Sequence, residues 1–142
     1  MSFDFADLST VEKANSGVAM TVRHPTTGLP LTGSDGKPVT LTLAGVDSDV
    51  FRNAKRRTAD HFATVVRSGG DPDVERQRTE TVADCTLGWS ANFSLNGKSL
   101  KHSAESARDL YEALPWLREQ ADAFIADRGN YFLVQSKEGS PG

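Results

Sequence analysis

Sulfur-containing and large aromatic residues are scarce in this chain of 142 residues, which has one cysteine, two methionines, two tryptophans and two tyrosines. The single cysteine, Cys85, excludes an internal disulfide, fits a reducing compartment and leaves no thiol cluster for a metal. No apolar run approaches the roughly 18 residues that a membrane-spanning helix needs. Asp4 stands where a signal peptide would be basic, and no apolar segment follows it. These absences predict a cytoplasmic chain without a membrane segment.

Excess positive charge is also lacking, since 16 basic residues stand against 19 acidic ones. The halves before and after residue 71 carry 8 basic and 8 acidic, then 8 basic and 11 acidic residues, so neither is a basic footprint for nucleic acid. One predicted helix contains a basic cluster of Arg52, Lys55, Arg56 and Arg57. The cluster could contact phosphate. We favour a solvated helical face, because Asp49 and Asp60 lie at pairing distance along the helix.

The first half of the chain predicts a hairpin and two helices. Apolar residues alternate with polar ones over 18–24 and 39–44, which is the period of a β-strand and indicates an antiparallel β-hairpin over 18–45. Its apolar face must lie on the rest of the domain, because an isolated hairpin is marginally stable. Residues 47–86 then predict two helices, the first over about 48–67.

The second of these helices is expected to begin with Asp71 as its N-cap and Pro72 in its first turn, and to end at about Cys85. Residues 88–102 predict a short second β unit with a two-residue turn at Asn96-Gly97. Two more helices follow over 103–129. Ser103 is the predicted N-cap of the first, and Pro115 marks the beginning of the second.

The predicted fold class is therefore α+β, with an N-terminal β-hairpin followed by a mainly helical domain that contains a short second β unit. Length and composition favour a single domain over 18–132. Residues 1–17 form a weakly patterned N-terminal segment that either makes one helical turn or stays mobile. Residues 133–142 end in Gly-Ser-Pro-Gly and predict a flexible tail.

Residue patterns for catalysis, metal binding or cofactor binding are not found. The three histidines, His24, His61 and His102, belong to different predicted elements and lack metal-ligand spacing. Cys85 has no cysteine-hydrolase signature around it and is expected to be a small apolar residue inside the fold. The sequence thus predicts a protein that is not an enzyme and has no cofactor. A small enzyme that pairs Cys85 with a histidine is the less favoured alternative.

Aromatic residues are concentrated over 89–132, and six of them are the candidates for contact with a partner. They are Trp89, Phe93, Tyr111, Trp116, Tyr131 and Phe132. Two interpretations are open for them. They form the core of the C-terminal half, or some of them line a groove for an apolar helix of another protein.

Two blocks of residues, together covering roughly 20–132, carry a family resemblance. The first consists of Val22-Arg23-His24-Pro25-Thr26-Thr27-Gly28, Gly36-Lys37-Pro38-Val39-Thr40-Leu41, and Ala44-Gly45-Val46-Asp47-Ser48 leading to Phe51-Arg52. The second consists of Leu87-Gly88-Trp89-Ser90, Asn96-Gly97-Lys98, Ser103 to Tyr111, and Pro115-Trp116-Leu117-Arg118-Glu119-Gln120 running on to Phe132. In this order of pieces the chain resembles the tail assembly chaperones of long-tailed, siphovirus-like bacteriophages and prophages.

The resemblance implies a non-catalytic protein that binds the tape measure protein, keeps it soluble and helps the tail tube to assemble. A frameshift-extended form would recruit the tail tube protein, and self-association is open. Such a protein would act in the host cytoplasm and be missing from the mature virion. The alternative is a structural virion component, such as a tail tube, tail terminator or neck subunit. Neither alternative involves nucleic acid or a membrane.

Overall fold

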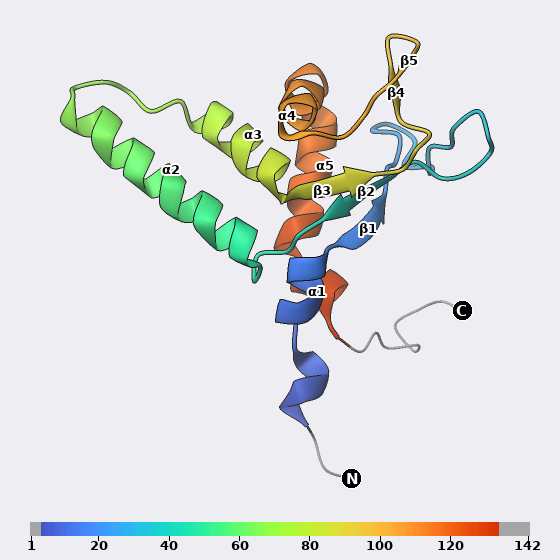
Figure 1. Cartoon of the computed structure of the whole chain (residues 1–142), viewed down its shortest axis with the longest axis horizontal. Coiled ribbons are helices and arrows are strands. Elements are labelled where there is room, and N and C mark those ends of the chain that lie inside the picture. The colour runs from blue at the N-terminus through green and yellow to red at the C-terminus, as the bar shows by residue number, and fades with distance from the viewer. Residues whose placement is uncertain (1–3, 134–142) are drawn as a thin grey trace.

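The computed structural model describes residues 4–133, which form an α+β fold, as the sequence predicts (Figure 1). The elements in chain order are η1 (Phe5–Leu8), α1 (Val11–Ser16), β1 (Val18–Thr21), β2 (Thr40–Leu43), α2 (Asp49–Arg67), α3 (Val74–Cys85), β3 (Thr86–Trp89), β4 (Ser94–Leu95), β5 (Lys98–Ser99), α4 (Ala104–Ala113), α5 (Pro115–Ala126) and η2 (Arg128–Tyr131). The strands form a three-stranded antiparallel sheet, β1-β2-β3, and a two-stranded hairpin, β4-β5. Residues 134–142, where the sequence predicts most of a flexible tail, lie outside the described residues.

The predicted N-terminal hairpin is confirmed, with β1 and β2 antiparallel and Met20 opposite Leu41. Both strands are shorter than the alternation predicts, because the connecting segment folds back between their ends. The Leu31 amide donates to the Val22 carbonyl, and the Leu31 carbonyl accepts from the Val39 amide, both at 2.9 Å. The connection is therefore tied to both strands.

The predicted second β unit is divided between two sheets. β3 joins the main sheet, where Gly88 lies opposite Thr42, and only β4 and β5 form the separate hairpin. This pairing gives the second edge of β2 its hydrogen-bond partners, which a buried strand requires. The Asn96-Gly97 turn is as predicted, with φ of 54° and 77°, the left-handed values that a tight hairpin turn needs. The expectation of one unit over 88–102 is wrong in this respect.

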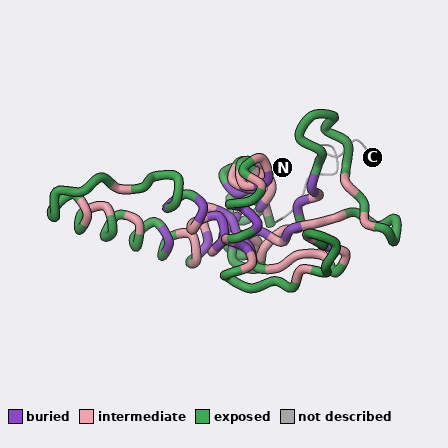
Figure 2. Tube along the Cα trace, turned by 90° about the horizontal axis from the view of Figure 1, so that it is seen from above, coloured by how far each residue is buried: buried purple, intermediate pink, exposed green. Residues whose placement is uncertain are grey.

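The core lies between the sheet and the helices α3, α4 and α5, where the buried residues gather (Figure 2). The largest fully buried side chains are Tyr111, Tyr131, Leu41, Leu43, Leu110, Leu117, Ile125, Val82, Cys85 and Ser48. The predicted starts of α4 and α5 are confirmed. The Ser103 hydroxyl accepts from the Ser106 amide in a capping box, and Pro115 occupies the first turn of α5. A core of this kind holds the sheet and three helices as one unit.

Gln120 of α5 closes one end of the open edge of β1. Its side-chain oxygen accepts from the Arg23 amide at 2.8 Å, and its side-chain nitrogen donates to the Arg23 carbonyl at 2.9 Å. The carboxamide thus makes the two hydrogen bonds that a residue of a neighbouring strand would make. It also fixes α5 to the segment that follows β1.

Helices α2 and α3 follow the predicted pair, but α3 begins later than expected. Its N-cap is Asp73, whose carboxylate accepts from the Arg76 amide at 3.1 Å, so Asp71 does not cap it and Pro72 lies outside the helix. Aspartates stand on both sides of Pro72, and sequence proximity alone does not decide which one caps. α5 likewise ends at Ala126, before the predicted stop near residue 129.

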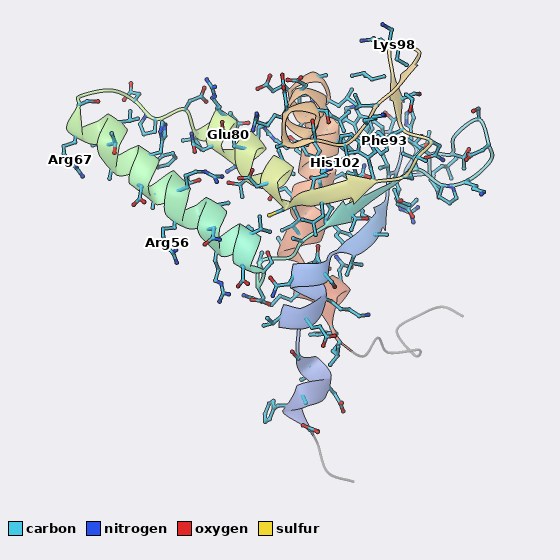
Figure 3. The ribbon with its side chains drawn as sticks, viewed as in Figure 1. Arg56, Arg67, Glu80, Phe93, Lys98 and His102 are labelled. Carbon is cyan, nitrogen blue, oxygen red and sulfur yellow. The ribbon has the colours of Figure 1, made fainter. Side chains whose placement is uncertain are left out.

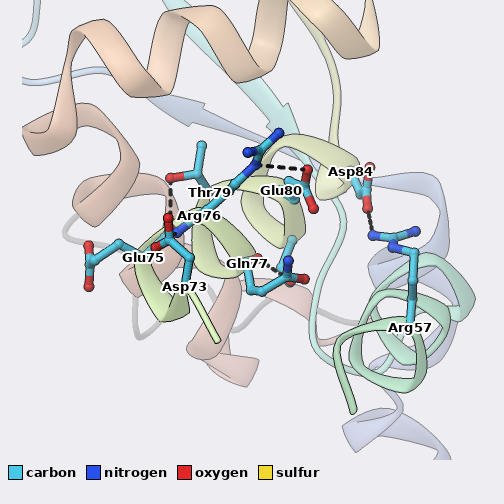
Figure 4. Close-up of polar contacts among 9 residues, drawn as sticks. Arg57, Asp73, Glu75, Arg76, Gln77, Thr79, Glu80 and Asp84 are labelled. Atoms are coloured by element: carbon cyan, nitrogen blue, oxygen red, sulfur yellow. Dashed lines mark hydrogen bonds and ion pairs between the residues drawn. The ribbon is translucent and has the colours of Figure 1, made fainter. Parts of the chain in front are cut away.

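Residues 49–78, comprising α2, the following turn and the first turns of α3, project from the rest of the molecule and are called the arm (Figures 1 and 2). Within 49–78 only Ala54 and Gln77 are buried. The remaining described residues are called the body. An ion pair between Arg57 of α2 and Asp84 near the end of α3 ties the two helices together (Figure 4). The arm therefore depends little on the core.

The N-terminal segment is docked on the body from Thr10 onward, so the predicted helical turn forms as α1. Ala14 is buried, and its carbonyl accepts from the Gly45 amide at 3.1 Å. Asp47 accepts from the Thr10 hydroxyl and from two nitrogens of Arg128, Nε at 2.9 Å and Nη2 at 3.1 Å. The Ser9 carbonyl accepts from the Leu133 amide at 2.7 Å, and η1 before it extends away from the body (Figure 1).

Candidate partner-binding grooves

Three of the six aromatic contact candidates belong to the core: Phe93, Tyr111 and Tyr131 are 7%, 1% and 0% exposed. The Tyr111 hydroxyl hydrogen-bonds the Thr86 hydroxyl at 2.6 Å, and burial raises the pKa of Tyr111 to about 12. The Tyr131 hydroxyl donates to the Leu43 carbonyl at 3.1 Å, and burial raises its pKa too. For the two tyrosines the core interpretation replaces that of a docking surface, because a partner cannot reach side chains with so little exposed area.

The other three candidates, Trp89, Trp116 and Phe132, are half-buried. The Trp89 ring stacks on Phe93 with centroids 5.0 Å apart and meets the edge of His102 at 4.9 Å. Its indole nitrogen also donates to a backbone carbonyl at 2.7 Å, so the ring is held in one orientation. Trp116 packs at the start of α5, and Phe132 follows η2. The structure does not bring the six candidates together on one face.

A groove of about 680 Å³ opens on the body where Phe93 lies, and we call it the body groove. Its walls come from the β1–β2 connection, the β4–β5 hairpin and α4. Its apolar lining consists of Leu31, Val39, Ala91, Phe93, Leu95, Leu110 and Leu114. Phe93 and Leu110 are buried and form the floor, while the four other large residues are half-buried. The groove thus presents a continuous apolar surface at the edge of the core.

The rim of the body groove is polar and internally bonded. The Asn92 side-chain nitrogen donates to the Asp35 carboxylate at 3.2 Å and to the Lys37 carbonyl at 3.0 Å. The Lys37 amide donates to Asp35 at 3.0 Å, and these bonds hold the pKa of Asp35 below its usual value. Gly33 allows this close approach, since an added Cβ would lie 2.7 Å from Asn92. The hydrogen bonds order the rim before any partner arrives.

Sequence reasoning identified Phe93 but missed the leucines and the valine that line this groove. Val39 lies on the predicted apolar face of a strand, and Leu95 flanks the Asn-Gly turn. Neither signal indicates that the side chain lines a groove. Their partial exposure depends on the folded-back β1–β2 connection, which no local pattern predicts.

A second, smaller groove of about 290 Å³ lies between the two helices of the arm, and we call it the arm groove. Phe51, Lys55 and Phe62 line it from α2, and Val74 and Arg78 line it from α3. The remaining lining residues are Thr58, Gln77, Thr81 and, from α5, Asp122. The arm groove combines an apolar floor with a mostly basic rim. The sequence does not predict this groove, because the pattern of α2 indicates a solvated basic helix.

The basic cluster of α2 behaves as a helical surface. Arg52 pairs with Asp49 on the same helix, as predicted, and both side chains are largely exposed. Arg57 turns instead toward Asp84 of α3. Arg56 points outward from the arm (Figure 3). The cluster therefore does not converge on one point, as contact with a single phosphate would require.

Cys85 and the three histidines do not form a catalytic group. Cys85 is 0% exposed, and burial, followed by the charges of Asp84 and Asp122, raises the pKa of its thiol to about 12. The thiolate needed for nucleophilic attack is thus disfavoured at neutral pH. The His24 ring accepts from two backbone amides of its own turn, and the His102 ring bonds a backbone carbonyl at 2.7 Å.

Residues 4–133 contain neither a cluster of metal-binding side chains nor a helix suited to span a membrane. No three histidine, cysteine or acidic side chains in this range gather closely enough to hold a metal ion. None of the helices in the same range combines the length and apolar character needed to cross a membrane. No protein-family model matches the chain, and no curated protein and no solved structure shows significant similarity to it.

Proposed function

We propose that this protein is a non-catalytic tail assembly chaperone that binds an apolar helical segment of a phage tape measure protein and keeps it soluble. The observation that carries the proposal is the body groove, with its buried floor at Phe93 and Leu110 and its half-buried aliphatic walls. An apolar groove with a polar, ordered rim is the surface to which amphipathic helices bind. No reacting group is required for this role.

The family resemblance supports the same proposal from a different direction. Both blocks of resembling residues contribute to the body groove, the first through Val39 and the second through Leu110. Between them, the groove takes Phe93 and Leu95 from the segment that joins the Gly-Trp and Asn-Gly pieces. Residues that are far apart in the sequence but belong to the resemblance thus share one surface.

In this role the protein acts in the host cytoplasm before the tail tube polymerises. It lowers the concentration of exposed apolar segments of its partner by binding them, with no covalent step. It leaves before the virion is complete. A frameshift-extended form would bring the tail tube protein to the same complex.

The test is co-expression with the tape measure protein encoded beside this chain. We expect the chain to raise the soluble yield of the tape measure protein and to co-purify with it. Leu95→Asp and Leu114→Asp place a carboxylate in the walls of the body groove and should weaken co-purification by about tenfold or more. Leu29→Asp is the matched control, because Leu29 is 66% exposed on the β1–β2 connection and does not line the groove.

Unchanged solubility of the tape measure protein together with no co-purification would contradict the proposal. An equal loss for Leu29→Asp would show that the body groove is not the binding surface. Mass spectrometry of purified particles separates the alternative function, because a tail tube, terminator or neck subunit would be present in stoichiometric amounts.

A further inference from the structure

The arm groove is open at the surface although its floor is apolar. Phe51 and Phe62 are half-buried there, and Val74 is 49% exposed. Lys55 and Arg78 stand on its rim, one on each helix. The two cations against the single carboxylate of Asp122 leave the lining with a net positive charge. A fitting occupant is therefore apolar and acidic.

The N-terminal segment of the chain has this composition. The exposed fractions of Phe5, Leu8 and Val11 are 80%, 45% and 50%, which makes this segment the largest gathering of exposed apolar side chains among the described residues. Asp4 precedes Phe5, Asp7 lies between Phe5 and Leu8, and both aspartates are exposed. Exposed apolar residues in such a cluster mark an interaction site.

The segment and the groove of one molecule point in different directions. Thr10 is fixed to the body through Asp47, and η1 extends from there on the side away from the arm (Figure 1). With its base fixed at Thr10 and its direction away from the arm, the segment is placed to meet the arm groove of another molecule.

We propose that the N-terminal segment of one copy, residues 4–11, docks into the arm groove of a second copy. Leu8 and its apolar neighbours cover the floor formed by Phe51, Phe62 and Val74. The aspartates of the segment pair with Lys55 and Arg78 on the rim. Arg78 has an exposed partner at 3.9 Å, Glu75, and is able to exchange it for an incoming carboxylate.

This contact joins two different surfaces, so it is heterologous and leaves one segment and one groove unused in every dimer. Further copies can add at both ends, and the assembly either closes into a ring or grows as a chain. The association is expected to rise with protein concentration and to weaken with salt, because the rim contacts are exposed ion pairs. It is independent of the body groove and of the proposed chaperone function.

The test measures the mass of the purified full chain by light scattering and sedimentation over a range of concentrations. Leu8→Asp disables the segment, and Lys55→Glu with Arg78→Glu disables the groove. All three residues are exposed, so the variants should fold, which circular dichroism checks. We expect each variant alone to associate about tenfold more weakly than the parent chain.

The decisive measurement mixes the two variants. Each supplies the surface that the other lacks, so an equimolar mixture should form a dimer and nothing larger. Arg56→Glu is the matched control, because Arg56 lies beside Lys55 in the helix but does not line the groove (Figure 3). It should associate like the parent chain.

Charge exchange gives an independent readout. The double substitution Asp4→Lys with Asp7→Lys should weaken association when it is made alone. Association should return when the same chain also carries Lys55→Glu and Arg78→Glu, because the charges of the segment and of the groove are then both reversed. A parent chain that stays monomeric at every concentration would overturn the proposal. So would a mixture of the two variants that remains monomeric, or a control that loses association as fully as the groove variant.

Discussion

Helix α5 buries Leu117, Ala121 and Ile125 within 12 residues, whereas the 19 residues of α2 bury only Ala54. Both helices carry apolar residues at helical spacing. The sheet, α3 and α4 pack against α5, whereas α2 packs mainly against α3, and Val66 near the end of α2 is 61% exposed. Helical periodicity thus shows that a helix has an apolar face, but it does not show what covers that face. An uncovered face is a candidate for contact with another molecule.

The largest expected effect comes from truncating one aliphatic side chain to alanine in the body and one in the arm. Leu41→Ala removes a side chain that is 0% exposed and should lower the free energy of unfolding by about 2–5 kcal/mol. Val66→Ala should change it by less than about 0.5 kcal/mol, because that side chain is already in contact with water. Urea denaturation measures both. Similar losses would mean that the arm is part of the cooperative core.

The second prediction tests whether the body stays closed to solvent. Both tyrosines of the chain lie in the body, and burial raises the pKa of Tyr111 to about 12 from a usual 10.0. The folded chain should therefore show no tyrosinate absorbance as the pH passes 10, whereas the urea-unfolded chain should. The unfolded state then releases protons that the folded state retains, so the free energy of unfolding falls as pH rises above about 10.

A folded chain that gained tyrosinate absorbance near pH 10 would show that water reaches the hydroxyls of Tyr111 and Tyr131. The distinction between a sealed body and an exposed arm would then be lost. Near-ultraviolet circular dichroism, recorded alongside, shows whether the chain is still folded at each pH.

The smallest expected change in the free energy of unfolding comes from breaking one of two ion pairs, one at the base of the body and one on the arm. Arg128→Gln removes the two hydrogen bonds to Asp47, whose side chain is only 23% exposed, and should lower the free energy of unfolding by a small but measurable amount. Arg52→Gln is the matched control and should cost almost nothing, because both members of its pair with Asp49 are more than 60% exposed, at 62% and 70%.

The loss of stability caused by Arg128→Gln should also depend on pH. The hydrogen bonds from Arg128 and Thr10 lower the pKa of Asp47 below its usual value of 3.8. The stabilisation is therefore present above pH 3.8 and is lost as the pH falls through the lowered pKa. The prediction would be contradicted if both substitutions lowered the free energy of unfolding equally. It would also be contradicted if the free energies of unfolding of the parent chain and of Arg128→Gln stayed different in acid. Hydrogen exchange at the Gly45 amide would report whether α1 loosens.

Local chemistry made part of the fold predictable. The alternation before and after the β1–β2 connection, the Ser103 cap, Pro115 and the Asn96-Gly97 turn all act within a few residues, and the structure confirms each of them. The position of β3 was missed because its pairing with β2 joins residues far apart in the chain. Such pairing depends on which strand edge is available after the chain has folded.

The candidate site was less predictable than the fold. Aromatic type identified residues with much surface to bury, but whether a partner or the chain itself covers them is decided by tertiary contacts. Tyr111 and Tyr131 each find a polar partner for the hydroxyl inside the body, at Thr86 and at the Leu43 carbonyl. The apolar lining of the body groove is mainly aliphatic, and residue type alone does not distinguish such side chains from those of the core.

The paired hydrogen bonds of Gln120 limit the use of the sheet edge as a template for aggregation. β1 is an edge strand, and unpaired edges invite the addition of strands from other molecules. The Gln120 side chain occupies the backbone hydrogen-bonding groups of Arg23, which follow the exposed edge of β1. A strand added from another molecule would have to displace this carboxamide before it could pair at Arg23. The same bonds join α5 to the segment after β1, so a shift of α5 would disturb this edge of the sheet as well.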